Sequence, residues 1–202
     1  MAKGPSYNVP YRRRREGKTD YRARKRLVLS GVPRVVVRKT RKHIIVQLVR
    51  PTVSGDEVIA AAHSRELRRK HGWLGDCNNL PASYLTGLLC GYKAVANGVG
   101  KAVLDMGLRM PSRGSSVFAA LKGFLDAGVD VPHDEKVLPD ENRIKGQHIA
   151  DYAGALSSDP DAYSRVFSRY VSRGFSPQKT PDHFSSVKEK IASDFGEPAQ
   201  RE

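Results

Sequence analysis

The first quarter of this chain carries the whole of its net charge. Residues 1–50 contain 16 Lys and Arg residues against 2 acidic residues, whereas residues 51–202 contain 19 of each kind. The four adjacent arginines at 12–15 repel one another in water, so this end resists packing into a core. A core must therefore be built by the remaining residues. A net charge of +14 that is confined to one end indicates a polyanionic partner, most often nucleic acid.

The composition is sufficient for one core of moderate size. Hydrophobic residues make up 39% of 202 residues, which suits one domain with an appendage. The two cysteines, Cys77 and Cys90, form no CxxC motif, and with no other cysteine they cannot build a Cys-rich zinc site or a disulfide framework, which fits a reducing compartment. No apolar run approaches the ~20 residues that span a bilayer, and no apolar signal segment follows Met1. We expect a cytoplasmic protein with no membrane partner, no metal and no cofactor.

Short β-rich runs follow the basic end. Residues 34–39 and 43–49 are joined by a short polar link, which predicts a hairpin. A third strand is expected over residues 57–63. Two further short strands are expected, at Ala102-Val103-Leu104 and at Val129-Asp130-Val131-Pro132.

Two longer segments show helical spacing of apolar residues. The first helix is expected to begin after Asn79 as N-cap and to end at Gly98, and the second to run from Ser115 or Ser116 to Gly128. Within the first, Gly87-x-x-x-Gly91 indicates a close backbone approach, which we expect between this helix and the sheet. Residues 64–78 are expected to be a charged connection. Polar helical stretches follow at about 143–156, 160–172 and 181–195.

These elements follow in the order β-β-β-α-β-α-β, which predicts an α/β fold. We expect a small mixed sheet with two packed helices, a basic extended N-terminal arm and a helical C-terminal extension. The predicted organisation is a basic RNA-binding arm at 1–26, an α/β core at 27–133 and the helical C-terminal extension at 134–202.

The arm and the hairpin are the strongest candidates for binding nucleic acid. Each Lys or Arg that neutralises a phosphate releases counterions, arginine can bridge phosphate oxygens, and tyrosine can stack on an exposed base. Strand alternation places Arg34 and Arg38 on one face of the first strand, so basic groups border a β surface. The predicted contacts are Tyr11, Arg12, Arg13, Arg14, Arg15, Lys18, Tyr21, Arg22, Arg24, Lys25, Arg26, Arg34, Arg38, Lys39, Arg41, Lys42, His43, Arg68 and Arg69.

Simpler interpretations exist for both basic segments. The arm alone can be a solvated tail or a targeting signal, although its basic character continues into the hairpin, which favours binding. For the patch of Arg65, Arg68, Arg69 and Lys70, a solvated face is as good an interpretation as an RNA contact, because Glu66 partly offsets the charge.

Motifs for catalysis are weak. Gly98-x-Gly100-Lys101 does not complete a P-loop, and the six histidines show no HExxH spacing. Ser185-x-x-Lys188 matches a serine-lysine pattern, but such a match is expected by chance in this polar C-terminal stretch. His133 follows a predicted strand end without a nucleophile or cofactor motif. We therefore expect no enzyme.

Several segments in collinear order resemble one known family. It is the family of large-subunit ribosomal protein eighteen of the universal scheme, in its archaeal and eukaryotic form. Any single segment is a weak match, but together they are specific and extend from about residue 5 to about residue 155. The matching segments are residues 11–21, 33–38, 85–94, 104–108, 117–123, 126–128 and 131–133.

The resemblance implies a structural protein of the large ribosomal subunit. Such a protein binds 5S rRNA and helps attach it to 23S rRNA in the central protuberance, beside the other 5S-associated protein. By position, the implied contacts fall on Arg12 to Arg15, Lys18, Tyr21, Arg22, Arg24, Arg26 and the basic residues of the hairpin. The length suggests an archaeal member. Two alternatives are a general RNA chaperone or nucleic-acid-coating protein, and a small hydrolase using His133 or Ser185.

Overall fold

The sheet at the centre of the molecule is mixed and has four strands. The structure is a computed structural model, and it describes residues 4–195. The strands are β1 (Arg34–Lys39), β2 (Ile44–Thr52), β3 (Gly55–His63) and β4 (Val103–Asp105), in the order β3-β2-β1-β4. β2 is antiparallel to β1 and β3, whereas β4 is parallel to β1. The predicted hairpin is confirmed, with Val35 opposite Leu48 in its register.

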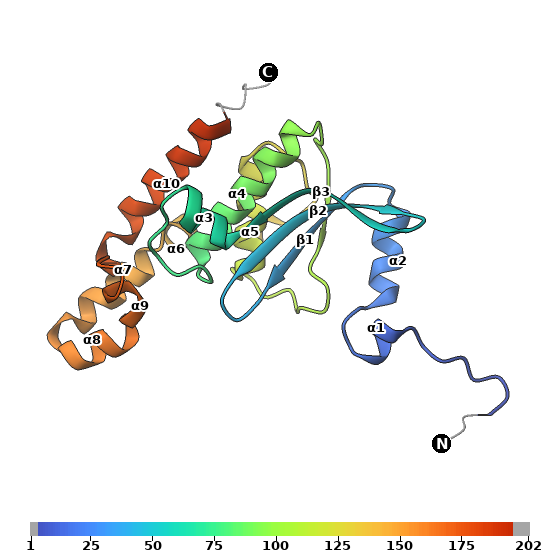
Figure 1. Cartoon of the computed structure of the whole chain (residues 1–202), viewed down its shortest axis with the longest axis horizontal. Helices are drawn as coiled ribbons and strands as arrows, with labels where there is room; N and C mark the ends of the chain where they lie inside the picture. Colours follow the sequence, from blue (N-terminus) through green and yellow to red (C-terminus); the bar gives the residue numbers. More distant parts are fainter. Residues whose placement is uncertain (1–3, 196–202) are drawn as a thin grey trace.

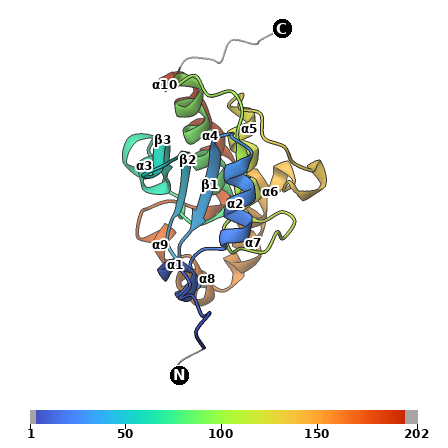
Figure 2. The ribbon, with the colours of Figure 1, turned by 90° about the vertical axis from the view of Figure 1, so that its right-hand side faces the viewer.

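Helices cover both faces of this sheet. On one face lie α4 (Leu80–Ala96) and α5 (Ser116–Asp126), and across the opposite face lies α2 (Tyr21–Leu29), as Figure 2 shows. The N-cap residues are Asn79 for α4 and Ser115 for α5, as the sequence predicts. The short helix α1 (Arg12–Arg15) precedes α2 at the N-terminal end of the molecule (Figure 1).

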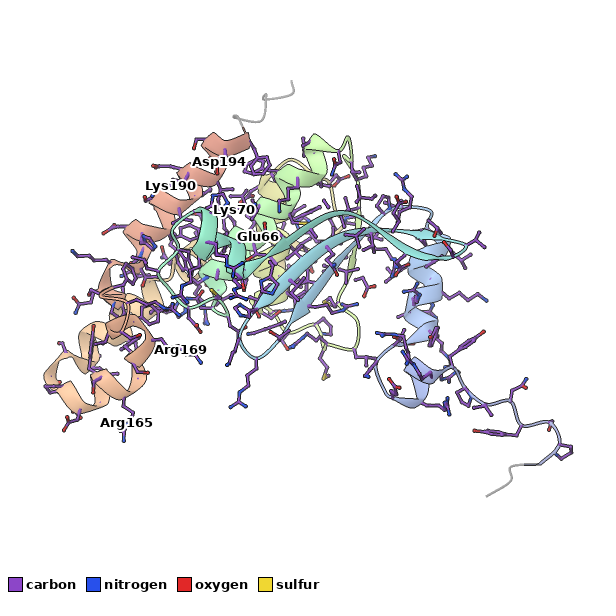
Figure 3. The ribbon with its side chains drawn as sticks, viewed as in Figure 1. Glu66, Lys70, Arg165, Arg169, Lys190 and Asp194 are labelled. Atoms are coloured by element: carbon purple, nitrogen blue, oxygen red, sulfur yellow. The ribbon has the colours of Figure 1, made fainter. Side chains whose placement is uncertain are left out.

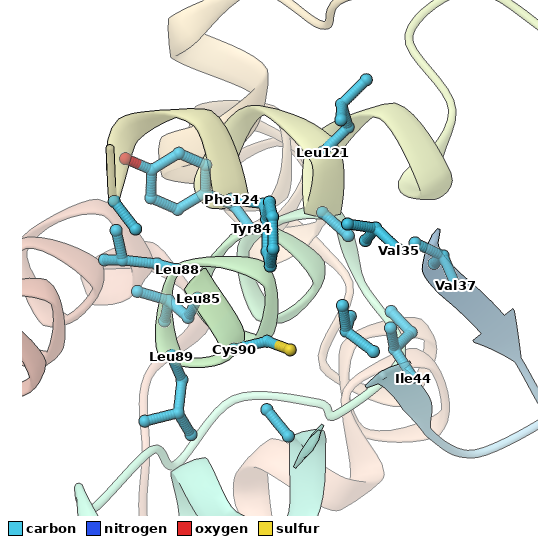
Figure 4. Packing of buried hydrophobic residues seen from close by; sticks show 14 of the residues in the cluster. Val35, Val37, Ile44, Tyr84, Leu85, Leu88, Leu89, Cys90, Leu121 and Phe124 are labelled. Atoms are coloured by element: carbon cyan, nitrogen blue, oxygen red, sulfur yellow. The ribbon is translucent and has the colours of Figure 1, made fainter. Parts of the chain in front are cut away.

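The core lies between the sheet and the pair α4 and α5. In Figure 4, Val35, Val37 and Ile44 of the sheet lie on the side of α4 that carries Cys90, whereas Leu85 and Leu88 point to the other side of this helix. All six residues belong to one buried cluster. Because side chains alternate along a strand, the odd-numbered valines of β1 enter this core and the even-numbered positions face α2. Cys90 is fully buried here, and Cys77 is buried as well, so neither thiol is exposed.

The two glycines of α4 allow a close crossing with α5, which corrects the predicted partner. A Cβ at Gly87 would collide with the backbone carbonyl oxygen of Ala120, and one at Gly91 would lie 2.5 Å from the Cβ of Ala127. Gly123 of α5 makes the reciprocal approach to the backbone of Tyr84. The approach therefore joins two helices, where we expected a helix against the sheet.

The C-terminal region is helical, as predicted, and it shares the main core. Its helices are α6 (Glu141–Lys145), α7 (Gln147–Ala155), α8 (Pro160–Val166), α9 (Ser168–Val171) and α10 (Thr180–Phe195), with single 3-10 turns η1 (Glu135–Val137), η2 (Leu156–Ser158) and η3 (Pro177–Lys179). Phe184, Val187 and Ile191 of α10 belong to the same buried cluster as α4. The boundary at residue 134 stays a prediction.

Two local predictions are wrong. Residues 129–132 form no strand, because the pairing there is limited to one isolated bridge between Lys101 and Asp130. The expected charged connection at 64–78 contains a helix, α3 (Ser64–Lys70), which begins with a capping box formed by His63 and Glu66. The capping box satisfies two backbone donors at the helix start, so the highly charged sequence still forms a helix.

Candidate nucleic-acid interface

The basic arm is held in a defined conformation by its own polar residues. Asp20 caps α2, accepting hydrogen bonds from the backbone N–H groups of Arg22 and Ala23 at 2.8 and 3.2 Å. The Tyr11 and Tyr21 rings, whose centroids are 5.0 Å apart, join the start of α1 to the start of α2. The predicted arm residues are therefore presented on two short helices, and Tyr11 is 72% exposed.

Most arm cations point into solvent. Neither α1 nor α2 contains a buried residue. Glu16 lies near two of these cations, at 3.7 Å from Arg12 Nε and 2.8 Å from Lys18 Nζ. Such exposed pairs are weak and leave a large positive excess. The exposed cations of the arm are Arg12, Arg13, Arg14, Arg15, Lys18, Arg22, Lys25 and Arg26.

Three of the predicted contact residues are instead engaged within the molecule. Arg24 of α2 donates two hydrogen bonds to the Asp56 carboxylate, at 2.8 and 2.9 Å. Arg34 is 1% exposed and lies between Asp56 and Asp105, with N···O distances of 2.8 and 2.9 Å. Arg38 reaches Asp105 at 3.4 Å. We expected a basic β surface that is open to solvent. At Arg34 this surface is covered by α2, Asp56 and Asp105.

This network ties α2 to the sheet. Burial alone would raise the pKa of Asp56, but the hydrogen bonds from Arg24 and Arg34 outweigh it and leave that pKa below its ordinary value. The hydrogen bond from Arg24 to Asp56 also raises the pKa of Arg24. A cavity of about 730 Å³, lined by α2 and the sheet, remains beside these ion pairs. These ion pairs therefore tie the arm to the sheet, beside partly buried apolar side chains such as Leu27.

The tip of the β1–β2 hairpin presents a second set of predicted residues. Arg41 and Lys42 are exposed, and the Arg41 carbonyl accepts a hydrogen bond of 2.9 Å from Asn78. Burial, followed by the nearby charge of Arg109, lowers the pKa of Lys39. Arg109 was missed by the sequence reasoning. It donates to the Lys39 carbonyl at 2.6 Å, and as one of two separated basic residues in the loop between β4 and α5 it gave no signal.

His43 behaves differently from the lysines and arginines around it. Its ring nitrogen Nδ1 lies 3.2 Å from Ser64 Oγ, and the ring packs on His63. Burial, with further contributions from His63 and Arg65, lowers the pKa of His43. In the protein alone, these surroundings therefore favour the neutral ring of His43 over the charged one.

Arg68 and Arg69 are exposed on α3, on the side of the molecule that faces the C-terminal helices. They line one cleft together with Arg65, Arg169 and the hairpin residue Lys42. Arg169 was also missed, because it lies in a segment whose charge is balanced. The structure thus brings part of the hairpin and α3 together, while the arm lies apart from them (Figure 1).

Other kinds of site find little support in residues 4–195. Within that range no helix is both long enough and apolar enough to cross a bilayer. The same range holds no group of three or more His, Cys, Asp or Glu residues placed to bind a metal ion. The Ser185 hydroxyl donates to the Pro181 carbonyl, and the His133 ring contacts the Val131 carbonyl, so each group is engaged locally.

These features define a class: a small α/β protein whose basic surface suits a polyanion. The family model for ribosomal large subunit proteins 60S L5 and 50S L18 matches residues 5–100 and 96–134. The large ribosomal subunit protein uL18 of Staphylothermus marinus is 54% identical over 196 residues, covering 96% of this chain and 97% of that protein.

The chain belongs to this family of large-subunit ribosomal proteins. The family resemblance seen in the sequence is therefore confirmed. It makes the chain a structural constituent of the large ribosomal subunit, whose surroundings are rRNA and other ribosomal proteins.

Proposed function

We propose that this chain binds 5S rRNA and helps attach it to 23S rRNA in the central protuberance, in cytoplasmic ribosomes and without catalysing a reaction. The observation that carries the proposal is the exposure of eight basic side chains on α1, α2 and the turn between them, with few acids nearby. The expected protein neighbours are large-subunit ribosomal proteins, including the other 5S-associated protein. Most contacts would position the RNA through its phosphates, and specificity would come from RNA shape and a few unstacked bases.

The fixed conformation of the arm supports this proposal. A capped helix tied to the sheet by Arg24 and Asp56 holds its exposed arginines at set distances from one another. Fixed spacing favours an RNA of matching shape over an arbitrary polyanion. Tyr11 and Tyr21, already in contact with each other, offer ring surface on which a base can stack.

The test compares two full-length variants that lose the same charge. One carries Gln at the four α1 positions, Arg12 to Arg15. The control carries Gln at four exposed basic positions of α6, α8 and α10, namely Arg143, Lys145, Arg165 and Lys190. Binding to 5S rRNA is measured across a salt series with excess unrelated RNA.

Loss of four phosphate contacts should reduce the slope of log affinity against log salt by about 3 to 4 in the α1 variant. The control variant should keep the slope of the natural chain. Equal binding of the natural chain to 5S rRNA and to unrelated RNA would contradict the proposal and favour a general RNA-coating protein.

A further inference from the structure

A second concentration of positive charge lies at the opposite end of the molecule from the arm. It is a cleft of about 720 Å³, in which Asp76 is the single acidic residue among the described residues that line it. In Figure 3 the label of Arg169 marks this end, beside the C-terminal helices, and the arm is at the other end of the long axis. The basic residues of the cleft are Lys42, Arg65, Arg68, Arg69, Arg169 and Arg173.

Three separate parts of the chain form the cleft: the β1–β2 turn, α3, and the region of α9. Internal hydrogen bonds fix the third part. Arg173 Nη1 donates to the carbonyls of Leu74 and Gly75, at 2.9 and 2.7 Å. The hydroxyl of Tyr170 accepts a hydrogen bond from the backbone N–H of Asp76 at 3.3 Å. The wall that carries Arg169 is therefore held in place by the fold.

The charge in the cleft is largely uncompensated. Arg169 forms an ion pair with Asp76 at 3.3 Å, and its side chain is still 56% exposed. Within residues 4–195, no carboxylate forms an ion pair with Lys42, Arg65, Arg68 or Arg69. Positive groups held this close repel one another, so a bound anion would stabilise them.

We propose that this cleft binds the phosphate backbone of an RNA segment other than the one that the arm contacts. The inference rests on the proposed function and adds a second point of attachment to it. Planar guanidinium groups can bridge phosphate oxygens, and the cleft presents five of them. No aliphatic or aromatic side chain lines the cleft apart from His43. Protein interfaces are centred on buried apolar and aromatic anchors, so RNA fits this cleft better than a protein partner.

The experiment isolates the cleft by using the full chain with Gln at Arg12 to Arg15. Its binding to a labelled RNA hairpin of arbitrary sequence is measured by fluorescence anisotropy across a salt series. Adding Arg65→Gln and Arg169→Gln should weaken binding about tenfold and reduce the salt slope by about 2. Replacing both arginines by Lys should preserve most of the slope, since the charge is retained.

The matched control adds Arg143→Gln and Arg165→Gln to the same background. Both are exposed residues of the C-terminal helices that do not line the cleft. Equal binding by the cleft variant and this control would overturn the inference, and so would an absence of hairpin binding in the background chain. Displacement of the hairpin by a deca-glutamate peptide at equal charge concentration would also overturn it, in favour of an acidic protein partner. Failure of 5S selectivity in the natural chain is a separate result, which bears on the proposed function alone.

Discussion

The two faces of the sheet are covered by helices that are attached in different ways. On one face α4 contributes 13 buried residues, whereas on the other face α2 contributes none. Apolar burial gives stability that persists in salt, while ion pairs such as the one between Arg24 and Asp56 are weakened by salt and can be replaced by phosphate. The stability of the fold therefore depends on the α4 face. The attachment of α2 contributes less to that stability and is more sensitive to salt.

The largest effect is expected where α4 crosses α5. Gly87→Ala places a methyl group against the Ala120 carbonyl, so the two helices must separate. We expect the free energy of unfolding to fall by about 3 kcal/mol, measured by chemical denaturation. Gly154→Ala in α7 is the matched control, because nothing lies within 4 Å of the added methyl group. The control should be stabilised by up to about 1 kcal/mol. An equal fall in the free energy of unfolding of both variants would contradict the conclusion that the close α4–α5 crossing requires Gly87.

A smaller loss is expected at the buried ion pair beneath α2. Asp105→Asn removes one of the two carboxylates that face Arg34, a side chain that is 1% exposed. Because Asp56 remains, we expect the free energy of unfolding to fall by about 2 kcal/mol. This is less than the usual cost of leaving a buried charge without a partner. Glu189→Gln, at an exposed residue of α10, should leave stability unchanged. An unchanged free energy of unfolding in Asp105→Asn would show that Asp56 alone is sufficient to balance the charge of Arg34.

The attachment of α2 is expected to contribute little to global stability. Arg24→Gln breaks an ion pair in which the arginine side chain is 36% exposed. The free energy of unfolding should therefore change by less than about 1 kcal/mol. The amide hydrogens of Tyr21–Leu29 should nonetheless exchange faster, as measured by mass spectrometry. Arg22→Gln, at an exposed neighbour on the same helix, is the control. Unchanged exchange in the Arg24 variant would mean that contacts other than charge hold α2.

The smallest expected effect is a response to pH. The pKa of Asp56 is lower in the fold than its ordinary value of 3.8, so its ion pairs are fully formed above pH 3.8 and are lost as the pH falls through the lower, folded value. The NMR signals of the Arg24 guanidinium should therefore be constant at neutral and mildly acidic pH and shift only below that value. In Asp56→Asn this response should be absent. A shift of the Arg24 signals near neutral pH would point to another titrating group.

Local patterns in the sequence predicted much of the fold. The β1 bounds and the N-caps of α4 and α5 follow from residue type and spacing alone. The strand expected at 129–132 did not form because its apolar residues, Val129 and Val131, are buried beside the helices and only one bridge pairs the backbone. Apolar residues indicate that a segment is buried. Backbone pairing into a sheet also requires a neighbouring strand, which the local sequence does not specify.

The sequence predicted the charge of the candidate site but not which residues of the chain contact one another there. A run such as 12–15 is visible in any sequence, and these arginines are exposed as expected. The burial of Arg34 depends on Asp56 and Asp105, and the latter lies 71 residues away along the chain. Arg169 reaches the cleft only because the C-terminal helices fold back toward α3. Contacts of this kind depend on tertiary structure, so spacing along the chain carries no sign of them.

The capped helix at the end of the arm bears on the entropy of assembly. Asp20 and the ion pair at Asp56 order the nine residues of α2 while the protein folds. Fixing a backbone costs about 1 to 2 kcal/mol per residue, and for α2 this cost falls on folding instead of on docking. A partner would therefore meet a preorganised surface here, and the rate at which the two associate would be limited by diffusion and charge more than by a search among arm conformations.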